Sequence, residues 1–313
     1  MFSVRHLHTS KGHRAALYAL APGRSEHHVL SAGGDGWIVE WDAGDPESGQ
    51  LVASIETRIF SLCSIPELNL IIAGNMDGGV HWIDRAAPDL TRNIQHHRKG
   101  VYDIVRSGQW IFTAGGDGIL TRWDLTAARA VESIQLSNQA LRCIAISESR
   151  QELAVGSSDG SIYFLDPDTL ELKNILKKAH TNSVFTLAYG PHHLFSGGRD
   201  AMLRVWTSNL ELRTSNLELQ TELPAHWFTI NHLAFSPDGA FLATASRDKT
   251  IKIWNPATLE LLKVVDTLRH GGHVNSVNRL LWLRHGTLVS CSDDRSVMWW
   301  EVKSIVTSEL EII

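Results

Sequence analysis

Short runs of alternating apolar and polar residues recur along the chain, each following an aspartate. The runs WIVEW (37–41) and TIKIW (250–254) are examples, and they are rich in β-branched and aromatic side chains. Alternation with a period of two is typical of β-strands. Gly, Asp and Ser cluster between the runs, where they suit tight turns. The pattern therefore predicts a chain of short strands joined by turns.

The runs belong to a repeat of about 41 residues with one aspartate in each copy. Successive aspartates are separated by 42, 40, 42, 41, 48 and 46 residues. A period of this length indicates repeated units of one supersecondary structure. The marker aspartates are Asp35, Asp77, Asp117, Asp159, Asp200, Asp248 and Asp294. Six residues after them stand Trp41, Ile83, Trp123, Leu165, Trp206, Trp254 and Trp300.

Several motifs resemble those of the WD-repeat family. They are GH at 12–13, WD at 41–42 and 123–124, and FSPDGAFLATASRDKTIKIW at 235–254. The resemblance covers essentially the whole chain and is carried by seven units in one frame. It implies an all-β fold, a seven-bladed propeller with four antiparallel strands per blade. Residues 1–313 are expected to form this propeller as a single domain.

The ring is expected to close through the N-terminal strand. The segment FSVRHLH (2–8) precedes the first GH motif, where the outer strand of a preceding blade belongs. It should complete blade seven, because closure leaves no long unpaired edge. The tail KSIVTSELEII (303–313) is the alternative occupant of that place.

A duplicated hexapeptide explains the longest interval. TSNLEL occupies residues 207–212 and again 214–219. Removing one seven-residue copy from the interval of 48 restores a period of 41. We expect the second copy to form the outer strand of blade five, because it keeps the normal spacing to His226. An amphipathic helix is the alternative. The interval of 46 has a similar excess around residues 266–272.

Five units share a histidine, a hydroxyl residue, an aspartate and a tryptophan. The hydroxyl stands four residues before the aspartate, and the histidine 20–22 residues before it. A neutral imidazole can donate to the carboxylate and accept from the hydroxyl, while the indole N–H joins the same chain. Such a network stabilises when every member is satisfied. The predicted members are His13, Ser31, Asp35 and Trp41; His97, Thr113, Asp117 and Trp123; His180, Ser196, Asp200 and Trp206; His226, Thr244, Asp248 and Trp254; and His273, Ser290, Asp294 and Trp300.

Units two and four depart from this pattern. They have Ile55 and Ser137 in the histidine position and lack the hydroxyl and the tryptophan. We expect them to keep only the turn aspartates, with apolar residues elsewhere. The Ser, His and Asp of the other units also invite comparison with a catalytic triad. We interpret them as structural, because five copies exceed what one enzyme needs and the hydroxyl lies mid-strand, where it is buried.

Composition excludes several classes of function. The net charge of −5 does not indicate binding to nucleic acid or to an anionic membrane surface. Cys63, Cys143 and Cys291 are too scattered for a disulfide framework, which favours a reducing, cytoplasmic location. No phosphate-binding loop, HExxH or CxxC motif occurs, so no cofactor is expected. The pairs at 27–28, 96–97 and 192–193 are poor metal ligands, because adjacent histidines on a strand point to opposite faces.

Function is therefore expected on a surface. In WD-repeat propellers, partners often dock on the face that carries the loop into each inner strand. The resemblance places partner-contacting positions three and five residues after the histidine position and one before the aspartate. Aromatic and Arg residues at such positions are typical of interfaces. The candidates carried over are Tyr18, Arg58, Phe60, Met76, Tyr102, Arg142, Phe185, Arg199 and Arg247.

The expected function is that of a non-enzymatic scaffold, a monomeric propeller that binds a protein or peptide, acidic in character, on this face. Two alternatives stay open. The protein could be a structural subunit of a stable complex, or its central channel could hold a small ligand or a catalytic site. The same residues also have interpretations without a binding role. The aromatic side chains could simply pack between inner strands, and the arginines could be solvated surface charges.

Overall fold

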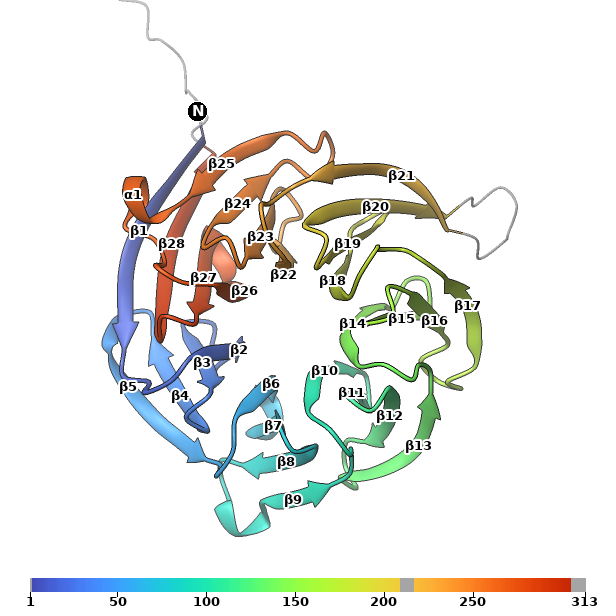
Figure 1. Ribbon diagram of the computed structural model, residues 1–313. Coiled ribbons are helices and arrows are strands. Elements are labelled where there is room, and N and C mark those ends of the chain that lie inside the picture. Colours follow the sequence, from blue (N-terminus) through green and yellow to red (C-terminus); the bar gives the residue numbers. More distant parts are fainter. Residues whose placement is uncertain (1, 209–216, 305–313) are drawn as a thin grey trace, which may run out of the picture.

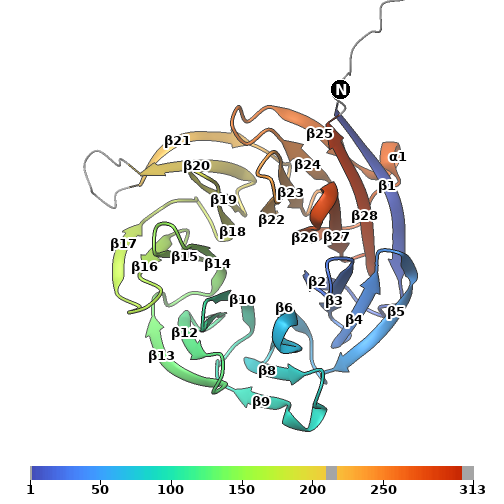
Figure 2. The ribbon, with the colours of Figure 1, turned by 180° about the vertical axis from the view of Figure 1, so that it is seen from behind.

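The computed structural model describes residues 2–208 and 217–304. Within them, seven four-stranded antiparallel sheets stand around a common axis as the blades of a ring, with the inner strands nearest the axis (Figure 1). The reverse view shows the same closed circle of blades (Figure 2). The predicted seven-bladed propeller is confirmed.

Each blade uses four consecutive strands, except the last. Blades one to three contain β2 (Leu17–Pro22), β3 (His28–Gly33), β4 (Trp37–Asp42) and β5 (Asp45–Ser54); β6 (Ile59–Ile65), β7 (Leu70–Asn75), β8 (Gly79–Asp84) and β9 (Arg92–Gln95); and β10 (Val101–Ser107), β11 (Trp110–Gly115), β12 (Ile119–Asp124) and β13 (Arg129–Gln135). Blades four and five contain β14 (Leu141–Ser147), β15 (Glu152–Ser157), β16 (Ile162–Leu165) and β17 (Leu172–Leu176); and β18 (Val184–Tyr189), β19 (Leu194–Gly198), β20 (Met202–Ser208) and β21 (Leu217–Pro224). Blades six and seven contain β22 (Ile230–Phe235), β23 (Leu242–Ser246), β24 (Ile251–Trp254) and β25 (Leu261–Val265); and β26 (Val277–Trp282), β27 (Thr287–Ser292), β28 (Ser296–Ser304) and β1 (Phe2–Lys11).

The first strand of the chain completes the last blade. β1 pairs antiparallel with β28, with Phe2 opposite Ser304 and Lys11 opposite Ser296. The indole of Trp299 donates to Ser10 Oγ at 3.0 Å. The prediction that the N-terminal segment closes the ring is confirmed, and β28 has no free edge.

Apolar clusters between neighbouring blades form the core. One cluster joins Ile72 and Trp82 of blade two to Val101 and Trp123 of blade three. The middle strands are buried on both faces, whereas outer strands such as β13 are largely exposed. Each blade therefore buries its apolar side chains against the blades beside it, which is how a repeat too small for its own core becomes stable.

The two long intervals contain different structures. Residues 217–219, the end of the second TSNLEL copy, lie in β21 and pair with β20, as predicted. Residues 209–212 of the first copy lie outside the described residues. The excess in blade six is a four-residue helix, α1 (Thr267–His270), in which Asp266 caps the Arg269 N–H and Gly271 ends the helix at φ 63°.

Short 3-10 turns complete the described elements. They span Pro66–Leu68, Pro88–Leu90 and Arg284–Gly286, each between strands of one blade. The three cysteines are all free thiols.

Deleting residues 1–10 should lower the melting temperature by about 5 °C or more. The deletion removes partly buried Phe2, Val4 and Leu7 from two clusters, and each buried apolar side chain is worth about 1.5–3 kcal/mol at most. Thermal unfolding by circular dichroism measures the effect. Deleting residues 305–313 serves as the comparison. An unchanged melting temperature without residues 1–10 would contradict closure by β1.

Candidate functional site

Blade one shows how the four polar positions meet. His13 Nδ1 lies 2.9 Å from Asp35 Oδ2, and His13 Nε2 lies 2.8 Å from Ser31 Oγ. Trp41 Nε1 donates to the same hydroxyl at 2.8 Å. Ser31 is fully buried and His13 nearly so. The four side chains form one continuous chain of hydrogen bonds.

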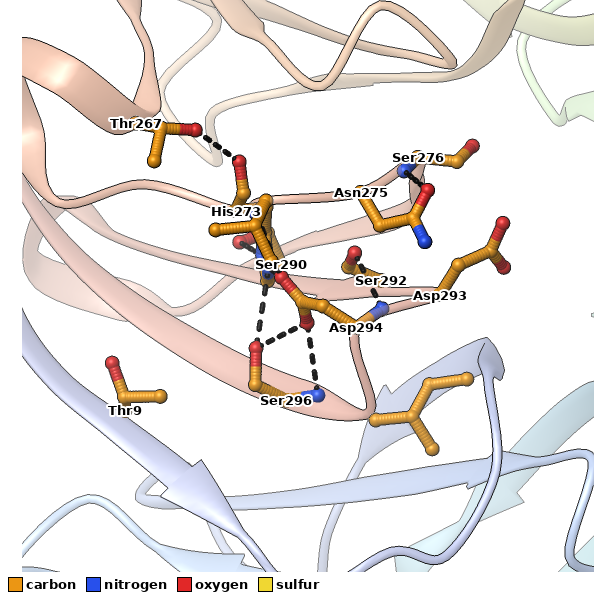
Figure 3. Close-up of polar contacts among 12 residues, drawn as sticks. Thr9, Thr267, His273, Asn275, Ser276, Ser290, Ser292, Asp293, Asp294 and Ser296 are labelled. Carbon is orange, nitrogen blue, oxygen red and sulfur yellow. Dashed lines mark hydrogen bonds and ion pairs between the residues drawn. The ribbon is translucent and has the colours of Figure 1, made fainter.

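The same arrangement occurs in blades three, five, six and seven. Figure 3 shows His273 of blade seven beside Ser290 and Asp294. The histidine-to-carboxylate distances in these four blades are 3.2, 2.8, 2.9 and 2.9 Å for His97–Asp117, His180–Asp200, His226–Asp248 and His273–Asp294. The imidazoles lie 2.8 Å from Thr113, Ser196, Thr244 and Ser290, and the indoles of Trp123, Trp206, Trp254 and Trp300 donate to the same hydroxyls at 3.0, 2.8, 2.9 and 2.9 Å.

A neutral imidazole satisfies every member of this chain. The indole donates to the hydroxyl, the hydroxyl donates to Nε2, and Nδ1–H donates to the carboxylate. Burial lowers the pKa of His13, His97, His180 and His226 and outweighs the opposing attraction of the aspartates. Burial alone would raise the pKa of Asp248, but hydrogen bonds from His226 and Thr250 lower it overall. The network therefore holds neutral histidine beside ionised aspartate.

Each aspartate also ties two backbone segments together. Asp35 accepts from the Arg14 N–H at 2.9 Å and from the Trp37 N–H at 3.2 Å. The first lies in the loop that enters the inner strand, and the second lies in the hairpin turn after the aspartate. Asp248 makes the equivalent bonds to Trp227 and Thr250. The carboxylates thereby fix the loops on one face of the ring, called the top face below.

Blades two and four correct the expectation of apolar substitutes. In blade four, Ser137 Oγ and the Tyr163 hydroxyl donate to Asp159 Oδ2 at 2.6 and 2.7 Å. In blade two, Asn75 Oδ1 accepts from the Asp77 and Gly79 N–H groups at 3.0 and 2.7 Å. Both blades thus keep polar bonds at the turn. Ser137 makes them from the histidine position, whereas Tyr163 and Asn75 make them from positions outside the repeated pattern.

Every inner strand carries a β-bulge at the same place. The register shifts between residues 17 and 19, 59 and 61, 101 and 103, 141 and 143, 184 and 186, 230 and 232, and 277 and 279. A bulge leaves one residue unpaired and redirects its side chain. The bulged residues are Tyr18, Phe60, Tyr102, Arg142, Phe185, Asn231 and Asn278. Together with Arg279 they line a cavity of about 210 Å³, called the funnel.

Aromatic rings and one guanidinium pack in sequence around the funnel. Tyr18 meets Phe60 edge-on at 5.4 Å between centroids, and Phe60 stacks on Tyr102 at 5.4 Å. Arg142 lies 4.3 Å from the Tyr102 ring and 5.2 Å from the Phe185 ring. Cation–π contacts of this kind are worth about 0.5–2 kcal/mol each. Five of the nine candidate residues therefore form one contiguous arc.

The other four candidates lie outside the funnel lining. Arg58, Met76, Arg199 and Arg247 are exposed. The Met76 N–H donates to the Arg58 carbonyl at 2.8 Å, so these two adjoin. The Arg199 and Arg247 N–H groups bond to the loops of their own blades, at Ser183 and Thr229. The structure does not bring these four side chains together.

An ion pair across the ring escaped the sequence reasoning. Arg279 of blade seven donates to Asp103 Oδ1 of blade three at 3.0 Å, and Asp103 Oδ2 accepts from the Ile144 N–H at 2.9 Å. Each of the two follows a bulged residue. In blades two, four, five and six, that position carries a residue that bonds the next inner strand, as when the Leu233 N–H donates to Thr186 Oγ1 at 3.0 Å; blade one has Ala19 there. The only sequence signal for this ion pair is that both residues stand directly after the bulged position of their blades.

Seven such sheets around one axis define a β-propeller built of repeated units. A family model, WD domain, G-beta repeat, matches residues 4–42, 88–124, 171–207, 217–255 and 262–301, more than half of the chain. The chain therefore belongs to the WD-repeat family. The five matched segments contain the five histidine networks, and the three inner strands of blades two and four fall between the segments.

Relatives and a solved structure agree with this assignment. The chain is similar to protein tipD of Dictyostelium discoideum, with 22% identity over 93% of this chain and 48% of the relative. It is similar to target of rapamycin complex subunit LST8 of Mus musculus, with 27% identity over 75% and 74%, and to actin-interacting protein 1 of Caenorhabditis elegans, with 20% identity over 93% and 47%. The chain thus spans about half the length of the first and third. The WD40 propeller domain of Doa1 has the same fold, with a TM-score of 0.82, 17% identity and 98% coverage of both chains.

Two kinds of feature are absent from the described residues. No group of three or more His, Cys, Asp or Glu side chains there could hold a metal ion. None of the helices in residues 2–208 and 217–304 has the length and apolar character to cross a membrane.

Replacing His226 by Ala should destabilise the protein by about 1–3 kcal/mol, because it leaves buried Thr244 and Asp248 without their partner. Adding Thr244→Ala should cost less than the sum of the two single changes, because the residues share one network. Urea denaturation measures both. The control is His27→Ala. The His27 side chain is 65% exposed, so this change should alter the free energy of unfolding by less than about 0.5 kcal/mol. Strict additivity would contradict a coupled network.

Stability should fall as the pH drops below about 6.5. Burial lowers the pKa of four network histidines. Below pH 6.5 the unfolded chain therefore binds more protons at these histidines than the folded chain does. The free energy of unfolding therefore decreases from pH 7.5 to pH 5.5. Denaturant titrations at these values measure it. A His226→Gln variant should show a smaller decrease, and equal or greater stability at pH 5.5 would be inconsistent with neutral buried imidazoles.

Proposed function

We propose that this protein is a non-enzymatic scaffold that binds a protein or peptide segment on its top face. The observation that carries the proposal is the bulge in every inner strand, because it turns Tyr18, Phe60, Tyr102, Arg142 and Phe185 toward one funnel. Aromatic and Arg side chains dominate the binding energy of protein interfaces. A partly buried arc of these types is well suited to hold an inserted side chain.

The charge of the funnel favours an acidic group in the partner. Arg142 donates to Ser158 Oγ at 2.8 Å, and no carboxylate of the described residues pairs with it. Its guanidinium already occupies faces of Tyr102 and Phe185, so a second cation there would be repelled. An Asp or Glu side chain, or a terminal carboxylate, complements this site.

The same geometry argues against a catalytic role. The five network hydroxyls are fully buried, whereas a nucleophile must reach its substrate. The funnel of about 210 Å³ is smaller than the usual ligand pocket of about 300–1,000 Å³. Arg279, which lines the funnel, is already paired with Asp103.

The names of two relatives support protein partners. One is a subunit of the target of rapamycin complex, and the other interacts with actin. A permanent subunit of a complex is the second candidate function, and retention of the partner at high salt distinguishes it from a transient scaffold. A cytoplasmic location, a monomeric ring and a single domain over residues 1–313 stay predictions.

Changing Arg58, Arg142 and Phe185 to Ala together should abolish capture of the partner. Loss of the guanidinium between two rings removes both the charge and the shape of the funnel, and hot-spot truncations cost about 2 kcal/mol or more each. Affinity purification with quantitative mass spectrometry compares the variant with the wild type.

The matched control changes Arg129 and Leu172, which are exposed on outer strands, to Ala. Control and triple variant should both melt as folded proteins. If the triple variant still captures every protein that the wild type captures, the binding site lies elsewhere.

A further inference from the structure

Exposed apolar side chains gather on two neighbouring top-face loops. Among the described residues, Trp227 is 87%, Phe228 59%, Leu268 97% and Val274 61% exposed. Trp227 and Phe228 lie in the loop entering blade six, and Leu268 and Val274 lie in the loop entering blade seven. Elsewhere in the described part of the chain, three large apolar side chains are more than half exposed, namely Leu51 at 52%, Leu68 at 51% and Leu90 at 66%. Such concentration marks an interaction surface rather than scattered exposure.

The backbone beneath the aromatic pair is fixed. The Trp227 N–H donates to Asp248 Oδ2 at 3.1 Å, and Ser246 Oγ donates to the Phe228 carbonyl at 3.1 Å. Asp248 is itself held by His226 of the buried network. Two rings on a fixed loop lose little entropy on binding, which is why rigid aromatic anchors bind efficiently.

Blades six and seven differ from the other five at two equivalent positions. The residue after the histidine position is apolar only here, as Trp227 and Val274; the others have Arg14, Glu56, Arg98, Asn138 and Thr181. The residue after the turn aspartate is basic only here, as Lys249 and Arg295; the others have Gly36, Gly78, Gly118, Gly160 and Ala201. The two blades thus repeat one combination of an exposed apolar residue and a cation.

The two cations occupy an unfavourable backbone conformation. Lys249 has φ 74° and Arg295 has φ 70°, where four other blades use glycine. A side chain in this left-handed region costs about 1 kcal/mol or more relative to glycine. A residue kept in such a conformation points to a role outside folding.

The charge around the apolar residues is unbalanced. Arg247, beside Phe228, is exposed, as are Lys249 and Arg295. None of the three forms an ion pair with a carboxylate of the described residues; Arg269 on α1, by contrast, is paired with Asp266. A partner that covers this surface gains most if it brings carboxylates next to its own apolar side chains.

We propose that the apolar residues Trp227, Phe228, Leu268 and Val274, with the cations Arg247, Lys249 and Arg295, form a docking surface for an acidic amphipathic segment of another protein. We call it the blade six–seven patch. It is separate from the funnel and does not depend on binding there.

Other occupants fit less well. A second copy would bring the same cations against each other. An anionic bilayer is flat and wide, and would also meet the exposed acidic residues Glu56 and Asp77 at the equivalent loop and turn of blade two. A protein segment covers two blades and avoids both conflicts.

The test selects a random dodecapeptide phage library on the wild-type protein after depletion on a Trp227→Thr/Phe228→Asn variant. These substitutions copy Thr181 and Asn182 of blade five, so the fold is expected to tolerate them. The enriched peptides should combine Asp or Glu with large apolar residues. Their affinity should fall at least about 10-fold on this variant.

A Lys249→Gly/Arg295→Gly variant removes the charges where glycine suits the backbone. It should melt no lower than the wild type and yet bind the peptides several-fold more weakly, with less dependence on salt. The Arg58, Arg142 and Phe185 triple variant should bind them normally. The matched control, Thr181→Trp/Asn182→Phe, carries the aromatic pair on blade five, where Ala201 replaces the cation that follows the turn aspartate, and should bind no better than the wild type.

The proposal is overturned if no acidic apolar peptides emerge, or if either patch variant binds them like the wild type. It is equally overturned if they are lost only with the funnel variant. Preference for vesicles of phosphatidylserine and phosphatidylcholine over the selected peptides would assign the patch to membranes instead.

Discussion

The turn aspartate is the constraint on which the ring depends. Each of the five networked carboxylates joins a hairpin turn, a buried histidine and the loop through which the chain passes from one blade to the next. In blade five, the Asp200 carboxylate also forms an ion pair with Arg204, with 2.8 Å between Oδ2 and Nη1, in addition to its bond with His180. Because that loop leads directly from an outer strand into the next inner strand, a bond within one blade also fixes its neighbour. The seven small sheets thereby share one rigid framework.

The bulge converts this rigid framework into a surface. A regular inner strand would place residue 18, 60 or 102 in the ladder with its neighbours, whereas the bulge leaves it unpaired next to the axis. In blades one, three, five, six and seven, the turn aspartates hold the loops that precede the bulges through backbone hydrogen bonds. The side chains at the bulged positions can therefore differ on one common backbone, so the same fold can carry many surfaces.

The sequence predicted what is repeated and missed what is local. Seven blades, the closing strand and the second TSNLEL copy followed from periods, because a period reports directly on equivalent units. Tyr163 and Asn75 were missed, since they rebuild the turn contacts from positions where other blades have different residues. The Arg279–Asp103 pair joins residues 176 apart on different blades, and no local pattern reports on such a contact. The roles of the funnel residues stay predictions.

In a ring of nearly equal units, a partner can be oriented uniquely only if the blades differ from one another. Seven identical blades would offer a partner seven equivalent positions. Here blade two presents Glu56, Met76 and Asp77, blades one to five supply the aromatic and Arg arc, and blades six and seven add Asn231 and Asn278 at the axis. Because equivalent positions differ in charge and shape from blade to blade, a partner that matches the ring in one rotation is mismatched in the others. The loss of symmetry among the blades is thus the feature from which specificity can arise.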